Sequence, residues 1–178
     1  PVANATSAET IEDQSIVINL SGTDVDGDPL TFSVGDPSNG TVEVNGNIAT
    51  YTPDADYHGA DSFTFTVSDG EVELDATATV DVTITPVNDA PVLASTDDVF
   101  FNEDDTTSIT ISATDVDDDD EISYSISGGS DISASLSGSD ITFTATTNFN
   151  GSETFTITAS DAELSDSQDI TVTVNAVN

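Results

Sequence analysis

The sequence predicts an all-β protein made of two tandem β-sandwiches joined by a short linker. Short runs rich in β-branched and aromatic side chains alternate between apolar and polar residues. Turn segments rich in Gly, Asn, Asp and Pro separate these runs, and the whole pattern occurs twice, about 90 residues apart. No segment of useful length has the apolar spacing of a helix.

Corresponding residues in the two halves lie 90 to 92 positions apart. The matched pairs are Pro1 and Pro91, Asp24 and Asp115, Asp26 and Asp117, Phe63 and Phe155, and Asp69 and Asp161. Agreement over the whole length indicates a tandem repeat. We therefore expect one repeat over residues 1–88, a second over residues 89–178 and a linker over residues 86–91.

The first half shows where the strands of each repeat should lie. Alternation predicts strands at 16–20, 30–34, 41–44, 48–52 and 63–67, and a long last strand that ends at residue 84. Asn45-Gly46 predicts a two-residue hairpin turn, because both positions tolerate positive φ. About seven short strands per repeat of ordinary domain length are typical of an immunoglobulin-like Greek-key sandwich.

The charge of the chain excludes several classes of partner. Lys and Arg are absent, Asp and Glu number 35, and the formal net charge is −35. A chain without basic side chains cannot neutralise phosphates, so nucleic-acid binding and electrostatic attachment to anionic lipid are excluded. The self-repulsion has to be offset by bound divalent cations or by a salty medium.

Other composition features give weaker constraints. The chain has no Cys, which is compatible with an extracellular protein stabilised by metal in place of disulfides. It contains no signal peptide and no apolar run of membrane length, so we expect no membrane insertion, and any targeting signal should lie outside this sequence.

The junction between the halves should be taut. Pro86 and Pro91 fix their own φ and bias the preceding residues to extended geometry. Asn88 and Asp89 lie between them and carry hard oxygen donors.

Pairs of the form Asp-x-Asp favour a calcium site. Calcium takes six to eight oxygen ligands, and such a pair places two carboxylates on one loop. The pairs are Asp24/Asp26, Asp54/Asp56 and Asp115/Asp117. The first pair does not fit an EF-hand, since Gly27 occupies the fourth position instead of the sixth.

Greek-key topology indicates which acids can meet. The loops after strands one and five lie at the C-terminal end of a sandwich, and those after strands two and six lie at its N-terminal end. The C-terminal end of the first repeat should carry Glu12, Asp13, Asp54 and Asp56, and the N-terminal end of the second Asp115, Asp117 and Asp161. With Asn88 and Asp89 between them, these groups would repel one another unless Ca²⁺ bound there.

These residues resemble bacterial cadherin-like tandem repeats of large surface adhesins, of the extender type found in RTX adhesins. The resemblance is carried by Glu12, the Asn88-Asp89 linker, Asp115/Asp117 and Asp161. It implies calcium at the junction, with up to three ions. Pro86 stands where the cadherin linker has its leading Asp, and a second Asn is missing before Ala90, so one or two ions are expected.

The same resemblance implies a half-site at each outer end of the pair. A half-site shared with a preceding repeat would consist of Asp24, Asp26, Asp28 and Asp69. A half-site shared with a following repeat would use Glu103, Asp104 and Asn178. Thr146 and Asn148 replace the acids at positions 54 and 56, so the second of these half-sites should bind calcium more weakly.

Each of these features also has a simpler interpretation. The acids could form a solvated surface, and the run 118–121 is expected to be one, with Asp119 as the exception because it matches Asp28. His58 should be an ordinary loop residue without zinc. The aromatic residues at alternating strand positions should be core, whereas Phe100 or Phe101 must face outward.

The expected function is a non-enzymatic, calcium-rigidified extender of a secreted or cell-surface bacterial adhesin, with a role in cell adhesion and biofilm formation. Its partners would be calcium and neighbouring repeats, and the pair would be a monomer. The alternative is a carbohydrate-binding or homophilic adhesion module that contacts cell-surface glycans or the same protein on another cell. Because the chain has 35 acidic residues, finding two carboxylates of the kind that glycosidases use has no diagnostic value. The single His is not part of a recognisable catalytic triad.

Overall fold

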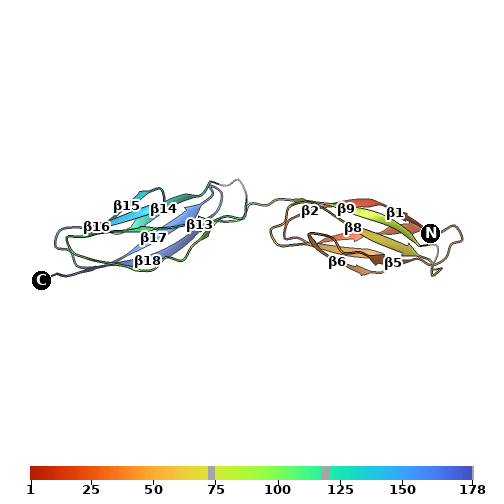
Figure 1. The fold of residues 1–178 in the computed structure, drawn as a ribbon, viewed down its shortest axis with the longest axis horizontal. Helices are drawn as coiled ribbons and strands as arrows, with labels where there is room; N and C mark the ends of the chain where they lie inside the picture. The colour runs from red at the N-terminus through yellow and green to blue at the C-terminus, as the bar shows by residue number, and fades with distance from the viewer. Residues whose placement is uncertain (72–74, 118–120, 178) are drawn as a thin grey trace. The chain divides into compact units, whose positions relative to one another are not determined.

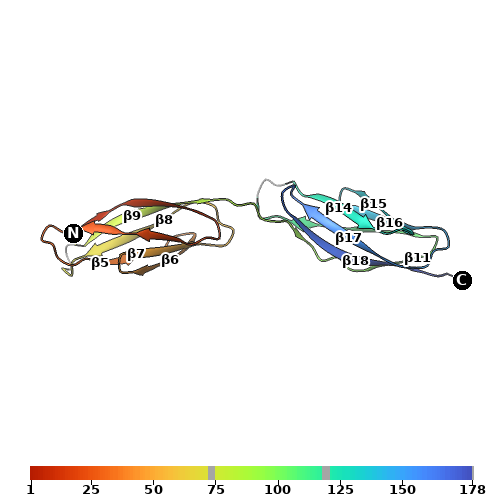
Figure 2. The ribbon, with the colours of Figure 1, turned by 180° about the vertical axis from the view of Figure 1, so that it is seen from behind.

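The computed structural model describes residues 1–71, 75–117 and 121–177, and this part of the chain contains strands and turns but no helix. It forms two compact units, unit 1 (Pro1–Val87) and unit 2 (Asn88–Asn178). Each unit is an immunoglobulin-like β-sandwich whose strands run along the unit (Figures 1 and 2). The all-β fold class expected from the sequence is confirmed.

Unit 1 consists of a four-stranded sheet in the order β2-β9-β8-β5, a three-stranded sheet in the order β3-β7-β6, and the pair β1-β4. Its strands are β1 (Val2–Asn4), β2 (Thr6–Ile11), β3 (Ile16–Asn19), β4 (Ser21–Thr23), β5 (Thr31–Val34), β6 (Gly40–Asn45), β7 (Ile48–Pro53), β8 (Gly59–Ser68) and β9 (Ala76–Thr85). All pairings are antiparallel except that of β2 with β9.

Unit 2 repeats this arrangement with the sheets β11-β18-β17-β14 and β12-β16-β15 and the pair β10-β13. Its strands are β10 (Val92–Leu93), β11 (Val99–Asn102), β12 (Thr106–Thr110), β13 (Ala113–Thr114), β14 (Ser123–Gly128), β15 (Ile132–Ser137), β16 (Asp140–Ala145), β17 (Gly151–Ser160) and β18 (Ser165–Asn175). Here β11 and β18 form the parallel pair.

Each core lies between its two sheets, where the buried apolar residues of the facing strands pack together. In unit 1, Tyr51 of β7 stacks on Phe63 of β8, with 6.2 Å between ring centroids. In unit 2, Phe143 of β16 meets Phe155 of β17 edge to face, with 5.2 Å between centroids. Phe101 is buried at 7% exposure and Phe100 is 64% exposed, as expected for neighbours on a strand.

Strand register determines which loops share an end of a unit. In unit 1, Ile11 is paired with Thr85 and Gly59 with Ile84, so the loops after β2 and β7 lie where the chain leaves β9. In unit 2, the pairs Val92–Thr114 and Ser123–Ser160 put the loops after β13 and β17 at its N-terminal end.

Two local expectations were wrong. The β6–β7 turn consists of Gly46 and Asn47, because Asn45 is paired with Ile48, and only Gly46 of the two turn residues has positive φ (63°). Strand β8 begins at Gly59, four residues before the expected start. Residues 59–62 look like a loop by composition, but they pair with β9 along their whole length.

Candidate metal centre

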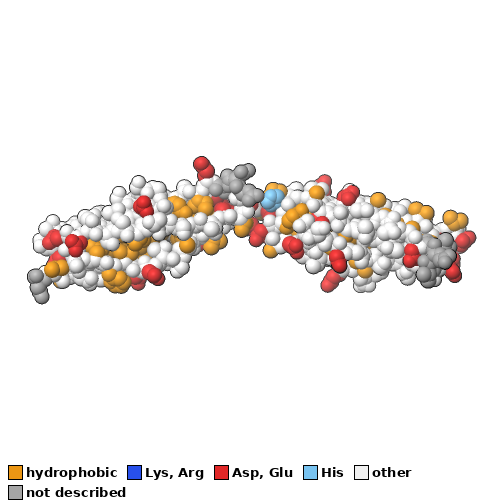
Figure 3. Space-filling model, in the orientation of Figure 1, with side chains coloured by type: hydrophobic (Ala, Val, Ile, Leu, Met, Phe, Trp, Pro, Cys, Tyr) orange, Lys and Arg blue, Asp and Glu red, His pale blue; other side chains and the backbone are white. Residues whose placement is uncertain are grey.

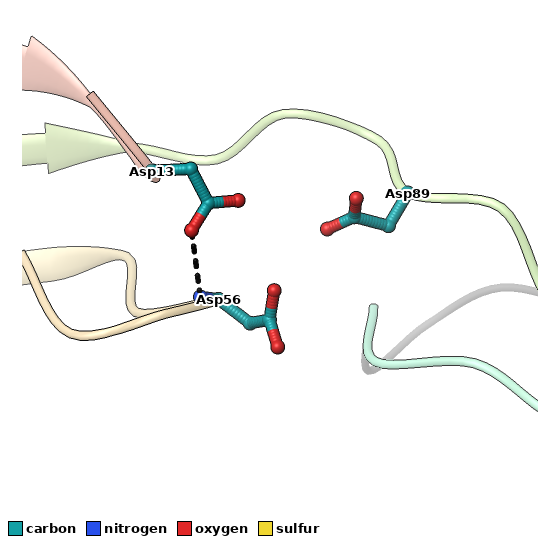
Figure 4. A group of neighbouring side chains, drawn as sticks. All are labelled: Asp13, Asp56 and Asp89. Carbon is teal, nitrogen blue, oxygen red and sulfur yellow. Dashed lines mark hydrogen bonds between the residues drawn. The ribbon is translucent and has the colours of Figure 1, made fainter.

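The C-terminal end of unit 1 brings together Asp13, after β2, and Asp56, after β7. The backbone N–H of Asp56 donates to Asp13 Oδ1 at 3.3 Å (Figure 4), and carboxylate oxygens of these two residues lie within 4.8 Å of each other. Both residues are in the left-handed region, with φ of 59° and 57°, which Asp tolerates better than most residues. The two loops therefore hold a pair of exposed carboxylates close together. Figure 4 also draws Asp89, which belongs to unit 2.

Glu12 lies beside this pair in sequence and is only 3% exposed. One of its carboxylate oxygens accepts the backbone N–H of Val87, and the other lies 3.8 Å from His58 Nδ1. An ionised carboxylate buried in this way requires hydrogen bonds or a cation nearby. Asp54 is exposed, and its backbone groups bond with Asn39 and Tyr57.

The N-terminal end of unit 2 gathers acids and amides from three segments. The side-chain amide of Asn88 donates to Asp161 Oδ2 at 3.0 Å. The N–H of Asp89 donates to Asp117 Oδ2 at 2.8 Å, and the N–H of Asp117 donates to Asp115 Oδ1 at 3.2 Å. Asp115 Oδ2 is buried, and among the described residues it is the one buried side-chain oxygen or nitrogen without a hydrogen-bond partner.

Asp161 is held in its ionised form. The N–H of Leu164 makes the largest contribution to lowering its pKa. Burial raises the pKa, but the Asn88 amide and the N–H of Glu163 lower it further. This carboxylate therefore carries a full negative charge at neutral pH, as a calcium ligand must.

The N-terminal end of unit 1 has a similar arrangement. Asp24 Oδ1 accepts the N–H groups of Asp26, Gly27 and Asp28 at 2.8, 2.9 and 3.3 Å. The N–H of Asp28 makes the largest contribution to lowering the pKa of Asp24, which burial opposes. The backbone nitrogen of Pro1 lies 3.3 Å from Asp24 Oδ2 and 3.9 Å from Asp69 Oδ2, so these two carboxylates converge. Asp26 and Asp28 are exposed.

The C-terminal end of unit 2 keeps the geometry of unit 1 with fewer charges. Glu103 Oε1 accepts the N–H of Val177 at 2.7 Å. Asp104 and Asn148 have φ of 66° and 59°, like Asp13 and Asp56, and Thr146 replaces Asp54. The expectations for Asp119 and Asn178 lie outside the described residues.

Two carboxylates that the sequence did not single out anchor turns. Asp61 accepts the N–H groups of Ser38 and Asn39 at 3.2 and 3.0 Å and the Tyr51 hydroxyl at 2.8 Å. Burial raises the pKa of Asp61, but the Tyr51 hydroxyl and these N–H groups outweigh burial and lower it. Burial and the neighbouring carboxylate raise the pKa of Tyr51.

Glu153 is the equivalent anchor in unit 2. It accepts the N–H groups of Ser130, Asp131 and Ile132. Burial raises the pKa of Glu153, but these bonds and the Ser130 hydroxyl outweigh burial and lower the pKa to about 2. The spacing of 92 between Asp61 and Glu153 is the signal that could have identified both residues.

A family model of the bacterial Ig domain matches the chain twice, over residues 1–85 and 88–173. The chain belongs to the bacterial Ig domain family. Two structures of human protocadherin-24 EC1-2 resemble the pair of Ig domains, with TM-scores of 0.59 and 0.57 and sequence identities of 19% and 17%. They match 96% and 97% of this chain, and the match spans 94% of each protocadherin chain. The likeness shows a tandem Ig-like and cadherin-like fold.

A further structural match is an endo-fucoidan hydrolase from glycoside hydrolase family 107, with 21% identity and a TM-score of 0.40. It matches 97% of this chain, which spans only 27% of that enzyme's length. The likeness is too low to support any argument about activity. No curated protein matches the sequence significantly. Nothing helical in the described part of the chain has the length and apolarity needed to cross a bilayer.

The donors at these ends fit calcium. They are hard carboxylate and amide oxygens, the ligand type that Ca²⁺ prefers. The unpartnered Asp115 Oδ2 is an acceptor that a cation would satisfy. Figure 3 shows acidic side chains on the visible surface of both units, and the sequence offers no Lys or Arg to neutralise them.

Proposed function

We propose that this pair of Ig domains is an extender segment of a large secreted or cell-surface bacterial adhesin and that calcium at the junction stiffens it. The observation that carries the proposal is the buried, unpartnered Oδ2 of Asp115, whose other carboxylate oxygen accepts the N–H of Asp117. The linker begins at the end of unit 1 that holds Glu12 and Asp13 and continues into the acidic end of unit 2.

Calcium would be held by carboxylates of both units together with the linker. The donors from unit 1 are Glu12, Asp13, Asp54 and Asp56, and those from the linker and unit 2 are Asn88, Asp89, Asp115, Asp117 and Asp161. Bound Ca²⁺ would neutralise their repulsion and restrict the bending of residues 86–91. We also propose that the first repeat ends at residue 88 and that the second begins at residue 89.

The outer ends are proposed as half-sites completed by neighbouring repeats. Asp24, Asp26, Asp28 and Asp69 would serve the N-terminal end of unit 1, and Glu103 with Asp104 would serve the C-terminal end of unit 2. Both should bind calcium more weakly than the junction, because each supplies only part of the six to eight oxygens that calcium takes.

The proposal is tested by calorimetric titration of the whole chain with CaCl₂ at constant ionic strength. Asp56→Asn gives unit 1 the residue that unit 2 already has at the equivalent position, Asn148. We expect this variant to weaken the tightest calcium site, and Asn148→Asp to leave that site unchanged. Absence of calcium binding in the wild type, or equal titrations for MgCl₂ and CaCl₂, would contradict the proposal.

A second candidate, binding of glycans or of a second copy, is favoured by one observation. Phe100 is 64% exposed on β11, an edge strand of its sheet. A single aromatic ring is smaller than the apolar patches that usually mark binding surfaces. Glycan binding or dimerisation that is lost in Phe100→Ser would favour this candidate over the extender.

A further inference from the structure

Both units share a contact between a glutamate and the backbone just after the last strand. Glu12 follows β2 and accepts the N–H of Val87, two residues beyond the end of β9. Glu103 follows β11 and accepts the N–H of Val177, two residues beyond the end of β18. The same arrangement thus occurs in each of the two compact units.

The contact prolongs a parallel ladder. In unit 1 the pairing of β2 with β9 ends at Ile11 and Thr85, and the N–H of Glu12 then donates to the carbonyl of Thr85 at 3.0 Å. In unit 2 the pairing of β11 with β18 ends at Asn102 and Asn175, and the N–H of Glu103 donates to the carbonyl of Asn175 at 2.9 Å.

The next rung of the ladder would need an acceptor for the N–H of the residue at 87 or 177. A backbone carbonyl normally supplies it in a parallel pair. Here the carboxylate of the same glutamate supplies it, so each glutamate uses its backbone on one rung and its side chain on the next. In unit 1 this carries the pairing past Pro86, which has no N–H to donate.

The bond is strong enough to matter, because a carboxylate acceptor makes a charge-assisted hydrogen bond. Glu12 is 3% exposed, so water competes little for it. His58 lies near Glu12, but Asn150 stands at the equivalent position of unit 2, where the contact with Val177 is also made. The contact therefore does not depend on a histidine partner.

We propose that Glu12 and Glu103 are metal-independent linker clamps that hold residues 86–87 and 176–177 against their own units. The clamps themselves do not depend on calcium. Their consequence rests on the proposed function: calcium would have to order only the part of the linker beyond Val87. Each unit then fixes the direction in which the chain leaves it before any ion binds.

Amide hydrogen exchange of the labelled whole chain, measured by NMR in EDTA, tests the clamp without calcium. We expect the amides of Val87 and Val177 to be protected in the wild type. Glu12→Ala should speed exchange at Val87 about tenfold or more and leave Val177 unchanged, because the lost bond is local and charge-assisted. Glu103→Ala should do the reverse, so each variant is the control for the other.

Glu12→Gln separates the clamp from the metal. Its side-chain carbonyl can still accept the N–H of Val87, so protection should persist in EDTA while the proposed calcium site weakens. A through-hydrogen-bond coupling between the Val87 nitrogen and the Glu12 carboxyl carbon would report the contact directly, even where Glu12→Ala fails to fold. Unprotected Val87 and Val177 in the wild type, or Val87 unaffected by Glu12→Ala, would overturn the clamp and leave the calcium proposal standing.

Discussion

Among the described acids of the second Ig domain, Asp115 is the one with a buried oxygen that lacks a hydrogen-bond partner, while its other oxygen accepts the N–H of Asp117. Such an oxygen costs free energy in the absence of a cation and becomes a ligand in its presence. A substitution of Asp115 therefore distinguishes an effect on metal binding from an effect on folding better than a substitution of any exposed Asp.

Asp115→Asn should weaken calcium binding at least roughly tenfold, because the charge of the ligands sets affinity in oxygen sites. In EDTA the variant should unfold at the wild-type temperature or higher, since it loses a charge from a repulsive group. Calorimetric titration and thermal unfolding check the two effects. Asp97→Asn, an exposed change of equal charge in the same domain, is the control, and equal affinities of the two variants would contradict the role of Asp115.

Glu153 should stabilise unit 2 in a pH-dependent way. Its folded-state pKa of about 2 lies below the ordinary value of 4.5. A carboxyl with a depressed pKa contributes stability that is complete above pH 4.5 and is lost as the pH falls towards 2.

Glu153→Gln should destabilise unit 2 by about 1–3 kcal/mol at pH 7, because a side-chain amide cannot accept on both of its ends and leaves an N–H such as that of Ile132 unsatisfied. The difference from wild type should shrink as the pH falls from 4.5 to 2, measured by thermal unfolding. Asp131→Asn removes a neighbouring charge without removing an acceptor used here, so it should have little effect. A difference in stability between Glu153→Gln and wild type that does not change with pH would contradict the anchoring role of the ionised Glu153.

At the level of elements, the sequence showed the strands better than their ends. Period-two alternation placed the core strands correctly, because burial of one face of a strand requires apolar residues at every second position. It could not show that residues 59–62 pair with β9, because that pairing is made by backbone groups and tolerates the loop-like residues Gly59 and Asp61. It also placed the β6–β7 turn one residue too early, since Asn45-Gly46 and Gly46-Asn47 are both good turn pairs.

The acids at the ends of the units were identified because their repeat spacing and Greek-key topology assign them to loops. Contacts between backbone and carboxylate, such as that of Glu12 with Val87, depend on side-chain direction and could not be read from spacing. Asp61 precedes the strand expected at 63–67, whereas the structure shows it in β8, where it anchors the turn before β6.

The turn before β15 should tolerate substitution far less than an ordinary hairpin turn. At Gly129 (φ 74°) a Cβ would lie 2.3 Å from the carbonyl of Ile132 and 2.4 Å from the Phe155 ring. Gly129→Ala should therefore destabilise unit 2 by more than about 2 kcal/mol, from backbone strain plus overpacking.

Gly138→Ala is the matched control for that turn. Gly138 has a φ of 62° and no atom within 4 Å of a built Cβ, so its substitution should cost only about 1 kcal/mol, from strain alone. Denaturant unfolding of both variants checks the difference. Equal costs would show that contact with Phe155 does not restrict Gly129.

At the scale of the whole molecule, two acidic Ig domains follow one another in a chain with a formal charge of −35. Without bound cations nothing fixes the linker in one conformation, and general salt screening relieves the repulsion between acidic groups only in part. Calcium bound by both domains would remove this freedom at a concentration too low to change screening.

Small-angle X-ray scattering of the whole chain in millimolar calcium and then in EDTA, at equal ionic strength, tests the central claim most directly. We predict one narrow distribution of distances with calcium and a broader distribution, with a more flexible profile, after chelation. Asp115→Asn should give the broad profile in both buffers. A maximum dimension and flexibility that are the same with and without calcium would contradict calcium stiffening of the junction.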